Sequence, residues 1–320
     1  MSRHTTLLLV NDKARNGRRY ASAVLRALPA GTYDVSPVYG TSLPRFDRYK
    51  RILIVGGDGA VRHIASFVRG GPPVGLIPAG TGNNLSQALR IPQKPDEAIA
   101  LALSGSSVRP IDVFAVTGAV KECYITTHGA LGIGAQIAYT YDRLRKTTLG
   151  RVCCYPCGEM IYRFLSLYEL AVGARPRYNV RISFPDREIE GCFAAIFLGN
   201  WAGIGGRFFP CPGAQPDDGL IHLCLISATL SRLQSFYLMR HIARGTHVLS
   251  DEPSDPGRTQ EVQTLLSDRV KLFRSPGPVG ISFLSEIPSV GLLADGDLFP
   301  VGRDLTFEVL RRRLPIVVPG

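Results

Sequence analysis

The sequence predicts an α/β domain followed by a domain rich in β-sandwich strands. Two apolar runs, Ile52–Val55 and Val74–Ile77, suit strands that are buried on both faces. Each run leads into a glycine-rich turn, and the segment between them carries apolar side chains at helical spacing at Val61, Ile64, Ala65 and Val68. Beyond these elements the pattern changes to many short strands separated by glycine or proline, which is typical of a sandwich.

The N-terminal domain is expected to alternate strands with helices. Thr6–Val10 is the first strand, Tyr20–Leu28 carries a helical apolar pattern, and Tyr33–Val38 is the second strand. After the two glycine-rich turns, Pro95–Leu103 has a helical pattern and Val108–Val116 reads as a further strand. This alternation is the pattern of an α/β domain.

The C-terminal domain is expected to consist mainly of strands. They are predicted at Cys123–Thr127, Val180–Phe184, Glu188–Leu198, Leu220–Ile226, Val270–Phe273, Val279–Leu284, Val290–Ala294 and Leu305–Leu310. Two helices interrupt them, the nearly all-apolar Met160–Val172 and the amphipathic Leu230–Ile242. We therefore divide the chain near Gly118, into residues 1–118 and 119–320, and leave open a return of the last strand to the first domain.

Composition and charge narrow the class of protein. The chain has 320 residues, enough for two cores, and its 45% hydrophobic and 20% charged residues are ordinary for a globular protein. Its net charge of +11 favours anionic partners such as a nucleotide, a nucleic acid or an anionic membrane surface. A basic surface without a specific partner is the alternative. No recognised nucleic-acid-binding module is present, so we expect no nucleic acid partner.

The sequence predicts a cytoplasmic protein with peripheral membrane contact. The apolar run Leu7–Val10 is too short for the core of a signal peptide, and no stretch approaches the roughly 18 apolar residues that span a bilayer. Seven scattered cysteines fit a reducing compartment. A homodimer is left open.

The two glycine-rich turns are the candidates for chemistry. They read Gly56-Gly57-Asp58-Gly59 and Pro78-Ala79-Gly80-Thr81-Gly82-Asn83-Asn84. Exposed N–H groups at a turn that starts a helix favour anions, above all phosphate. Asp58 would repel a phosphate unless a cation lay between them, and Mg²⁺ would fit. The spacing matches neither the Rossmann fingerprint nor the Walker loop. An ordinary turn with a solvated Asp58 is the alternative.

These segments carry a resemblance to a known family. GGDGAVRHIASF followed by GLIPAGTGNNLSQAL resembles the catalytic domain of the diacylglycerol kinase and sphingosine kinase superfamily, and is similar to the soluble bacterial lipid kinases. NAD kinases and phosphofructokinases share the GGDG turn, but PAGTGNN points to the lipid branch. The resemblance implies a nucleotide-binding α/β domain like that of NAD kinase or phosphofructokinase, with ATP and Mg²⁺ as cofactors.

The resemblance also implies which residues contact the nucleotide. They are Gly56, Gly57, Asp58, Gly59, Gly80, Thr81, Gly82, Asn83 and Asn84 in the two turns, with Asn11, Arg15, Thr41 and Asp112 elsewhere. Asp112 lies inside an apolar strand, where an unpaired acid would be costly. Ala60 and Asn84 stand where relatives often carry threonine and aspartate.

Further along the chain, two acidic turns match the family. Between residues 198 and 225, the resemblance places a structural Mg²⁺ on Gln215, Asp218 and Leu220, although an Asp-Gly hairpin turn would explain the same residues. In Ala294-Asp295-Gly296-Asp297, relatives read D-G-E, and a carboxylate here could take the proton of a lipid hydroxyl. The resemblance favours Asp295, with Asp297 as the second candidate. A plain turn between strands is the alternative.

Together these observations predict an ATP-dependent lipid kinase, with diacylglycerol as the first choice of acceptor and phosphatidic acid as the product. Ceramide, a sphingoid base, monoacylglycerol and phosphatidylglycerol are alternative acceptors. A kinase of a soluble acceptor, similar to NAD kinase, and an inactive lipid- or nucleotide-binding relative are the alternative functions. The basic side chains Arg143, Arg145, Lys146 and Arg151, with Arg311–Arg313, are candidates for contact with the membrane.

Overall fold

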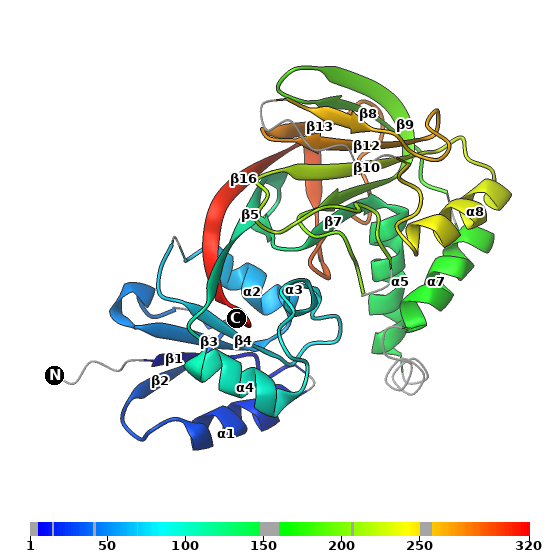
Figure 1. Cartoon of the computed structure of the whole chain (residues 1–320). Coiled ribbons are helices and arrows are strands. Elements are labelled where there is room, and N and C mark those ends of the chain that lie inside the picture. Colours follow the sequence, from blue (N-terminus) through cyan, green and yellow to red (C-terminus); the bar gives the residue numbers. More distant parts are fainter. Residues whose placement is uncertain are drawn as a thin grey trace. The chain divides into compact units, whose positions relative to one another are not determined.

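A computed structural model describes residues 6–14, 16–40, 43–68, 70–147, 160–173, 175–205, 208–249 and 258–320. The chain divides into two compact units, Met1–Val113 with Leu310–Gly320, and Phe114–Val309. Strands β5 (Val108–Ala119) and β16 (Val301–Val317) each run from one unit into the other (Figure 1). The second unit is thus inserted into the first. None of the helices described is both long and apolar enough to cross a bilayer.

The first unit is built on a parallel sheet. Its strands lie in the order β2 (Tyr33–Pro37), β1 (Thr6–Val10), β3 (Arg51–Gly56) and β4 (Val74–Pro78), and all neighbours are parallel. Ile316 of β16 pairs in parallel with Val74 at the β4 edge. The side chains of β3 and β4 are almost fully buried, which is why these runs are continuously apolar.

Helices cover both faces of this sheet. Helices α1 (Gly17–Ala27) and α4 (Pro95–Ser104) pack on one face, and α2 (Asp58–Ala65) lies on the other (Figure 1). The remaining helices are the short α3 (Asn84–Ala88) and a 3₁₀ turn, η1 (Phe46–Arg48). The connection from β1 runs to one side of the sheet and the connection from β3 to the other, so the strand order reverses between β1 and β3. Ligands of such sheets bind at this reversal, outside the carboxyl ends of the strands.

The second unit is an antiparallel sandwich with helices at one end. Its main sheet has the order β11–β12–β10–β9–β8–β13–β16, β7 pairs with β9 and β14, β15 pairs with β14, and β6 pairs with β5. The bounds are β6 Cys123–Ile125, β7 His128–Gly132, β8 Tyr178–Ser183, β9 Glu188–Gly199, β10 Ile221–Ser227, β11 Gln260–Val262, β12 Val270–Ser275, β13 Val279–Phe283, β14 Leu292–Ala294 and β15 Asp297–Phe299. The predicted fold class is confirmed.

Three helices of the second unit pack together. They are α5 (Ile133–Lys146), α7 (Met160–Ala171) and α8 (Arg232–Ile242). Tyr141 of α5 stacks against Tyr162 of α7, with ring centroids 4.6 Å apart. Ser231 and Gln234 form a reciprocal cap at the start of α8. These contacts hold α5 against α7 and define the start of α8.

A buried histidine makes the second unit sensitive to acid. The Nε2 of His247 donates a hydrogen bond to the carbonyl oxygen of Pro210, and burial lowers the pKa of His247 to about 4. Between about pH 6.5 and pH 4 the unfolded chain binds this proton and the folded chain does not, so stability falls as the pH falls. We expect the protonation of His247 in the unfolded chain to lower the free energy of unfolding by about 2 kcal/mol between pH 7 and pH 4.5.

Urea denaturation of the wild type and of His247→Gln, at both pH values, tests this expectation. The glutamine amide can still donate to Pro210 but does not titrate, so the variant should lose less stability on acidification than the wild type. Equal losses in the two proteins would show that another group carries the acid sensitivity.

Candidate active site

The two glycine-rich turns lie against each other at the carboxyl end of the parallel sheet. A Cβ atom on Gly80 would lie 2.8 Å from the Cα of Gly57, and one on Gly57 would lie 3.0 Å from the Cα of Gly80. Asn83, with φ 48°, closes the second turn, since its side chain accepts from the N–H of Gly80 (3.0 Å) and donates to the carbonyl oxygen of Gly80 (3.1 Å). Thr81 is exposed at the tip of this turn, and Gly82 is half-buried. The tip is the part that a phosphate could reach.

Asp58 joins the two turns. Its side chain is buried, and one carboxylate oxygen accepts from the backbone N–H (2.8 Å) and the side-chain amide (3.1 Å) of Asn84. The other oxygen accepts from the backbone N–H of Leu85 (2.9 Å). Asp58 thus binds the first N–H groups of α3, as a capping residue does, across a gap of 26 residues in the chain. It is not the solvated acid of an ordinary turn.

Two further predicted residues lie in the first unit. The backbone N–H of Asn11 donates to the carbonyl oxygen of Val55 (2.9 Å), which places the turn after β1 beside the end of β3. Asp112 is buried in β5 and accepts from the backbone N–H of Arg312 (2.7 Å), a residue with φ 50°. Asp112 therefore supports the backbone of β16. The predicted residues Arg15 and Thr41 lie outside the described residues.

The contact between the turns leads to a prediction for Gly80→Ala. The added Cβ would lie 2.8 Å both from the Cα of Gly57 and from the Oδ1 of Asn83, so the turns must move apart. We expect the free energy of unfolding to fall by about 1–3 kcal/mol, as measured by urea denaturation. Gly71→Ala is the matched control, because its Cβ meets only a Val68 methyl at 3.7 Å. Similar stability of the two variants would contradict the close packing.

In the second unit, Asp295 lies in a cage of hydrogen-bond donors. One carboxylate oxygen accepts from the backbone N–H (2.6 Å) and the hydroxyl (2.9 Å) of Thr126. The other accepts from the backbone N–H (2.8 Å) and the hydroxyl (2.6 Å) of Thr127 and from the backbone N–H of His128 (3.1 Å). The side chain is buried. These five bonds explain why the predicted strand Cys123–Thr127 ends early, since Thr126 and Thr127 turn their N–H groups toward the carboxylate.

His128 extends this cage. The hydroxyl of Thr127 has one hydrogen and donates it to Asp295, because a carboxylate only accepts, so the Nδ1 of His128 donates to Thr127 across 3.0 Å. Burial lowers the pKa of His128, and the charge of Asp295 opposes this shift. Sequence reasoning missed Thr126, Thr127 and His128. Their only signal is three polar residues in succession between apolar segments.

Asp295 and Asp297 belong to one tight hairpin. Ala294 pairs with Asp297, and the central residues Asp295 and Gly296 have φ values of 46° and 95°. Such a two-residue turn needs positive φ at both central positions. Asp295 faces inward to the cage, whereas Asp297 is exposed at the start of β15. The two carboxylates therefore have different surroundings although they are two residues apart.

The structure brings the three predicted metal ligands into one loop. Asp218 accepts from the backbone N–H groups of Gln215 (3.0 Å) and Leu220 (2.9 Å). The Nε2 of the buried His222, which sequence reasoning missed, donates to Asp218 across 2.9 Å. Among the described residues, no cluster of three His, Cys, Asp or Glu side chains could hold a metal. One carboxylate and two carbonyl groups remain the proposed Mg²⁺ donors, a set of hard oxygen atoms.

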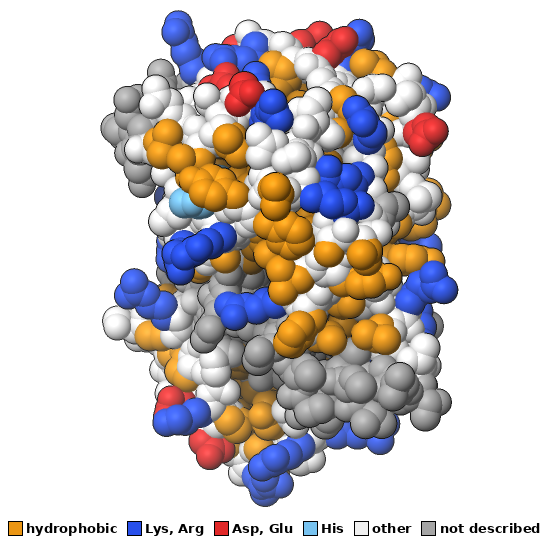
Figure 2. Space-filling view, turned by 90° about the vertical axis from the view of Figure 1, so that its right-hand side faces the viewer, with side chains coloured by type: hydrophobic (Ala, Val, Ile, Leu, Met, Phe, Trp, Pro, Cys, Tyr) orange, Lys and Arg blue, Asp and Glu red, His pale blue; other side chains and the backbone are white. Residues whose placement is uncertain are grey.

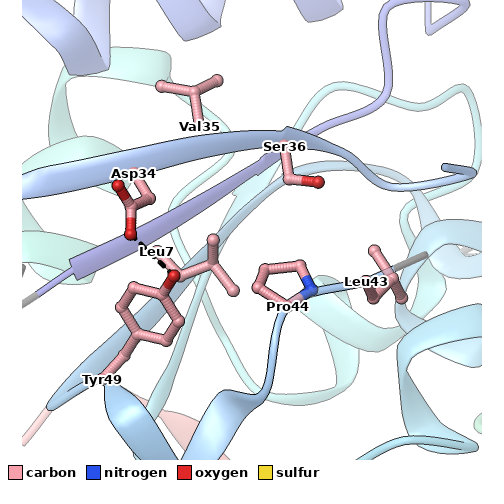
Figure 3. Close-up of a pocket in the computed structure, with 7 residues that line it drawn as sticks. All are labelled: Leu7, Asp34, Val35, Ser36, Leu43, Pro44 and Tyr49. Carbon is pink, nitrogen blue, oxygen red and sulfur yellow. Dashed lines mark hydrogen bonds between the residues drawn. The ribbon is translucent and has the colours of Figure 1, made fainter.

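A shallow pocket of about 410 Å³ lies along the β2 edge of the first unit (Figure 3). Leu7, Asp34, Val35 and Ser36 line it from the middle of β1 and β2, and the hydroxyl of Tyr49 donates to Asp34 (2.7 Å). Burial, with this bond, raises the pKa of Tyr49 to about 12. Among the residues that the structure describes, no predicted site residue lines the pocket, and the carboxyl ends of the strands lie elsewhere. We therefore do not assign the pocket to the nucleotide.

Two family descriptions match the chain. Residues 7–116 match "Diacylglycerol kinase catalytic domain", and residues 135–273 match "YegS C-terminal NAD kinase beta sandwich-like domain". The first match contains both glycine-rich turns and Asp112. The second contains the loop of Asp218 and His222.

Curated relatives and solved structures agree with these matches. A protein of Pseudomonas aeruginosa named "Probable lipid kinase YegS-like" is 33% identical over 56% of this chain and 55% of its own length. A diacylglycerol kinase of Mycobacterium tuberculosis is 28% identical over 63% of each chain. The chain thus spans little more than half the length of the curated relatives it matches. The structure of a diacylglycerol kinase from Bacillus anthracis shares the fold, with a TM-score of 0.63, 17% identity and coverage of 100% of this chain and 98% of that one.

Proposed function

This chain belongs to the diacylglycerol kinase superfamily, and we propose that it transfers the γ-phosphoryl group of ATP to the hydroxyl group of a lipid. The observation that carries the proposal is the pair of glycine turns that Asp58 holds together at the carboxyl ends of β3 and β4, beside the strand-order reversal of the parallel sheet. We propose diacylglycerol as the acceptor. The resemblance to relatives with that name supports this choice.

The first unit supplies groups for the nucleotide. Glycines at residues 57 and 80 let the two turns pack against each other, and the turn tip at Thr81 and Gly82 is accessible to a phosphate. Asp58 keeps both turns in register through the start of α3. Mg²⁺ bound with ATP would offset the phosphate charge, and the oxygens of Asp58 and Asp112 are donors that suit this ion.

The second unit supplies the carboxylates for the acceptor. Phosphoryl transfer needs a base within hydrogen-bond reach of the attacking hydroxyl. The oxygens of Asp295 already accept five hydrogen bonds, so we propose that Asp295 anchors the hairpin and that the exposed Asp297 takes the proton. The hydrogen bonds to Asp295 then fix the hairpin that carries Asp297.

A labelling experiment tests this function. The purified protein is incubated with γ-labelled ATP, Mg²⁺ and vesicles that contain diacylglycerol, ceramide, sphingosine and phosphatidylglycerol, with NAD added as a soluble acceptor in a parallel sample. We expect labelled phosphatidic acid. Another labelled lipid would change the acceptor, and labelled NADP would replace the lipid kinase by a kinase of a soluble acceptor. ATP binding without any labelled product would overturn the proposed activity.

A further inference from the structure

Helix α7 carries an exposed apolar stripe. Phe164, Leu167, Tyr168 and Val172 follow one another at helical spacing and are between 42% and 63% exposed. The opposite stripe, with Ile161 and Leu165, is buried against α5. An ordinary surface helix would present polar side chains on its outer face. The outer stripe of α7 is therefore more apolar than its packing within the second unit requires.

Helix α8 adds to this stripe. Leu233 is 83% exposed, and Tyr237, one turn later, is also exposed, whereas Leu238 and Ile242 point into the core. The guanidinium group of Arg232 donates to the carbonyl oxygens of Leu170 and Ala171 at the end of α7, which fastens the two helices together. We call the side chains Phe164, Leu167, Tyr168, Val172, Leu233 and Tyr237 the apolar face.

Positive charge predominates on the helices that carry the apolar face and on α5, which packs against α7. Exposed cations on α5, α7 and α8 are Arg143, Arg145, Lys146, Arg163, Arg232 and Arg240. The described parts of these helices contain two acids, and both are engaged, since Asp142 pairs with Lys146 (2.6 Å) and Arg145, and the buried Glu169 accepts from Thr140 (2.8 Å). Figure 2 shows apolar side chains gathered across this side of the molecule, with Lys and Arg among them and acidic side chains toward the edges of the view.

We propose that the apolar face docks into the interfacial layer of an anionic phospholipid bilayer. Phenylalanine and leucine side chains would enter the acyl boundary, the hydroxyl groups of the tyrosines would lie at the depth of the headgroups, and the surrounding cations would contact lipid phosphates. The cations around these helices would repel a positively charged partner and attract a negatively charged surface. Docking would bring the enzyme to its acceptor, because a lipid acceptor lies in a bilayer. In this respect the docking surface rests on the proposed function.

Vesicle binding without ATP tests the docking surface. Sedimentation with vesicles of phosphatidylcholine containing 30% phosphatidylglycerol is compared for the wild type and for the variant Phe164→Ser/Leu167→Ser/Leu233→Ser. All three side chains are exposed, so folding should be unaffected. We expect the variant to bind at least about tenfold more weakly. Val35→Ser and Val120→Ser, at exposed apolar positions outside the apolar face, are the matched controls and should bind like the wild type.

A charge variant tests the lipid type. Arg143→Glu/Arg163→Glu/Arg240→Glu should lose the preference for phosphatidylglycerol over pure phosphatidylcholine, and salt should weaken the binding of the wild type more than that of the variant. Wild-type protein that does not bind vesicles would overturn the proposal. A wild-type dimer in solution that the serine variant converts to monomer would overturn it as well, because a second copy would then cover the face.

The outcome for docking can be told apart from the outcome for the kinase. A short-chain diacylglycerol in solution needs no bilayer, so the serine variant should phosphorylate it as fast as the wild type does while losing activity on vesicles. Vesicle binding without phosphorylation of any lipid would refute the kinase and leave the docking surface. Phosphorylation of the soluble lipid without vesicle binding would refute the docking surface and leave the kinase.

Discussion

Replacement of Asp58 by asparagine is expected to lower the turnover of lipid phosphorylation by about two to three orders of magnitude. The carboxylate accepts three hydrogen bonds from Asn84 and Leu85, and asparagine has only one accepting oxygen and presents an N–H₂ group to these donors. At least one buried donor loses its partner, and the start of α3 shifts away from the first turn. We expect the free energy of unfolding to fall by about 1–3 kcal/mol as well.

The turnover and the stability of Asp58→Asn are measured on the same preparation. Asp34→Asn is the matched control, because Asp34 also lies in the first unit and accepts from Tyr49 at the sheet edge, away from the turns. It should keep near wild-type turnover. If the activity of Asp58→Asn fell only in proportion to its unfolded fraction, Asp58 would be a structural residue and not part of the phosphate site.

Asp295→Asn is expected to be the most destabilising single change in the second unit that we consider. Three backbone N–H groups and two hydroxyls converge on this carboxylate, and an amide cannot accept from all five. Buried donors that are left without acceptors destabilise the folded state, so the free energy of unfolding should fall by about 3–5 kcal/mol. Kinase activity should be lost together with the geometry of the hairpin. Urea denaturation and the labelling assay measure the two effects.

Asp297→Asn distinguishes the proposed proton acceptor, Asp297, from Asp295, which holds the hairpin. Asp297 is exposed, so its replacement should change stability by less than about 0.5 kcal/mol. If Asp297 accepts the proton, turnover should still fall by about 10²–10⁴-fold, with a changed pH dependence. Full activity of Asp297→Asn, combined with a folded and inactive Asp295→Asn, would assign the proton transfer to Asp295 instead.

The strands and the glycine turns of the first unit were predictable because their signals are local. Thr6–Val10 is a strand with the predicted bounds, and the continuous apolar runs before both turns are buried strands of a parallel sheet. Helix α2 contains Val61, Ile64 and Ala65 of the predicted apolar spacing and ends before Val68. In each case the period of the apolar side chains and the neighbouring glycines decide the element within a few residues of the chain.

The partners of the site residues were not predictable. Asp112 binds the backbone of Arg312, 200 residues further on, and Asp295 binds Thr127 at a separation of 168 residues. A hydrogen bond between such distant positions leaves no periodic pattern in the sequence. His222 likewise looked like an ordinary strand residue until its ring was found on Asp218. The sequence therefore identifies the acids but not what each carboxylate accepts.

The insertion of the second unit into the first bears on how the protein acquires its structure during synthesis. Val74 at the β4 edge pairs with Ile316, and Asp112 needs the backbone of Arg312. A ribosome that has released residues 1–113 has not yet made these partners, so the first unit stays incomplete until residues 310–320 emerge. The sandwich, which is contiguous in the chain, can form first. A fragment that stops at residue 116 would leave the β4 edge uncovered and prone to aggregation.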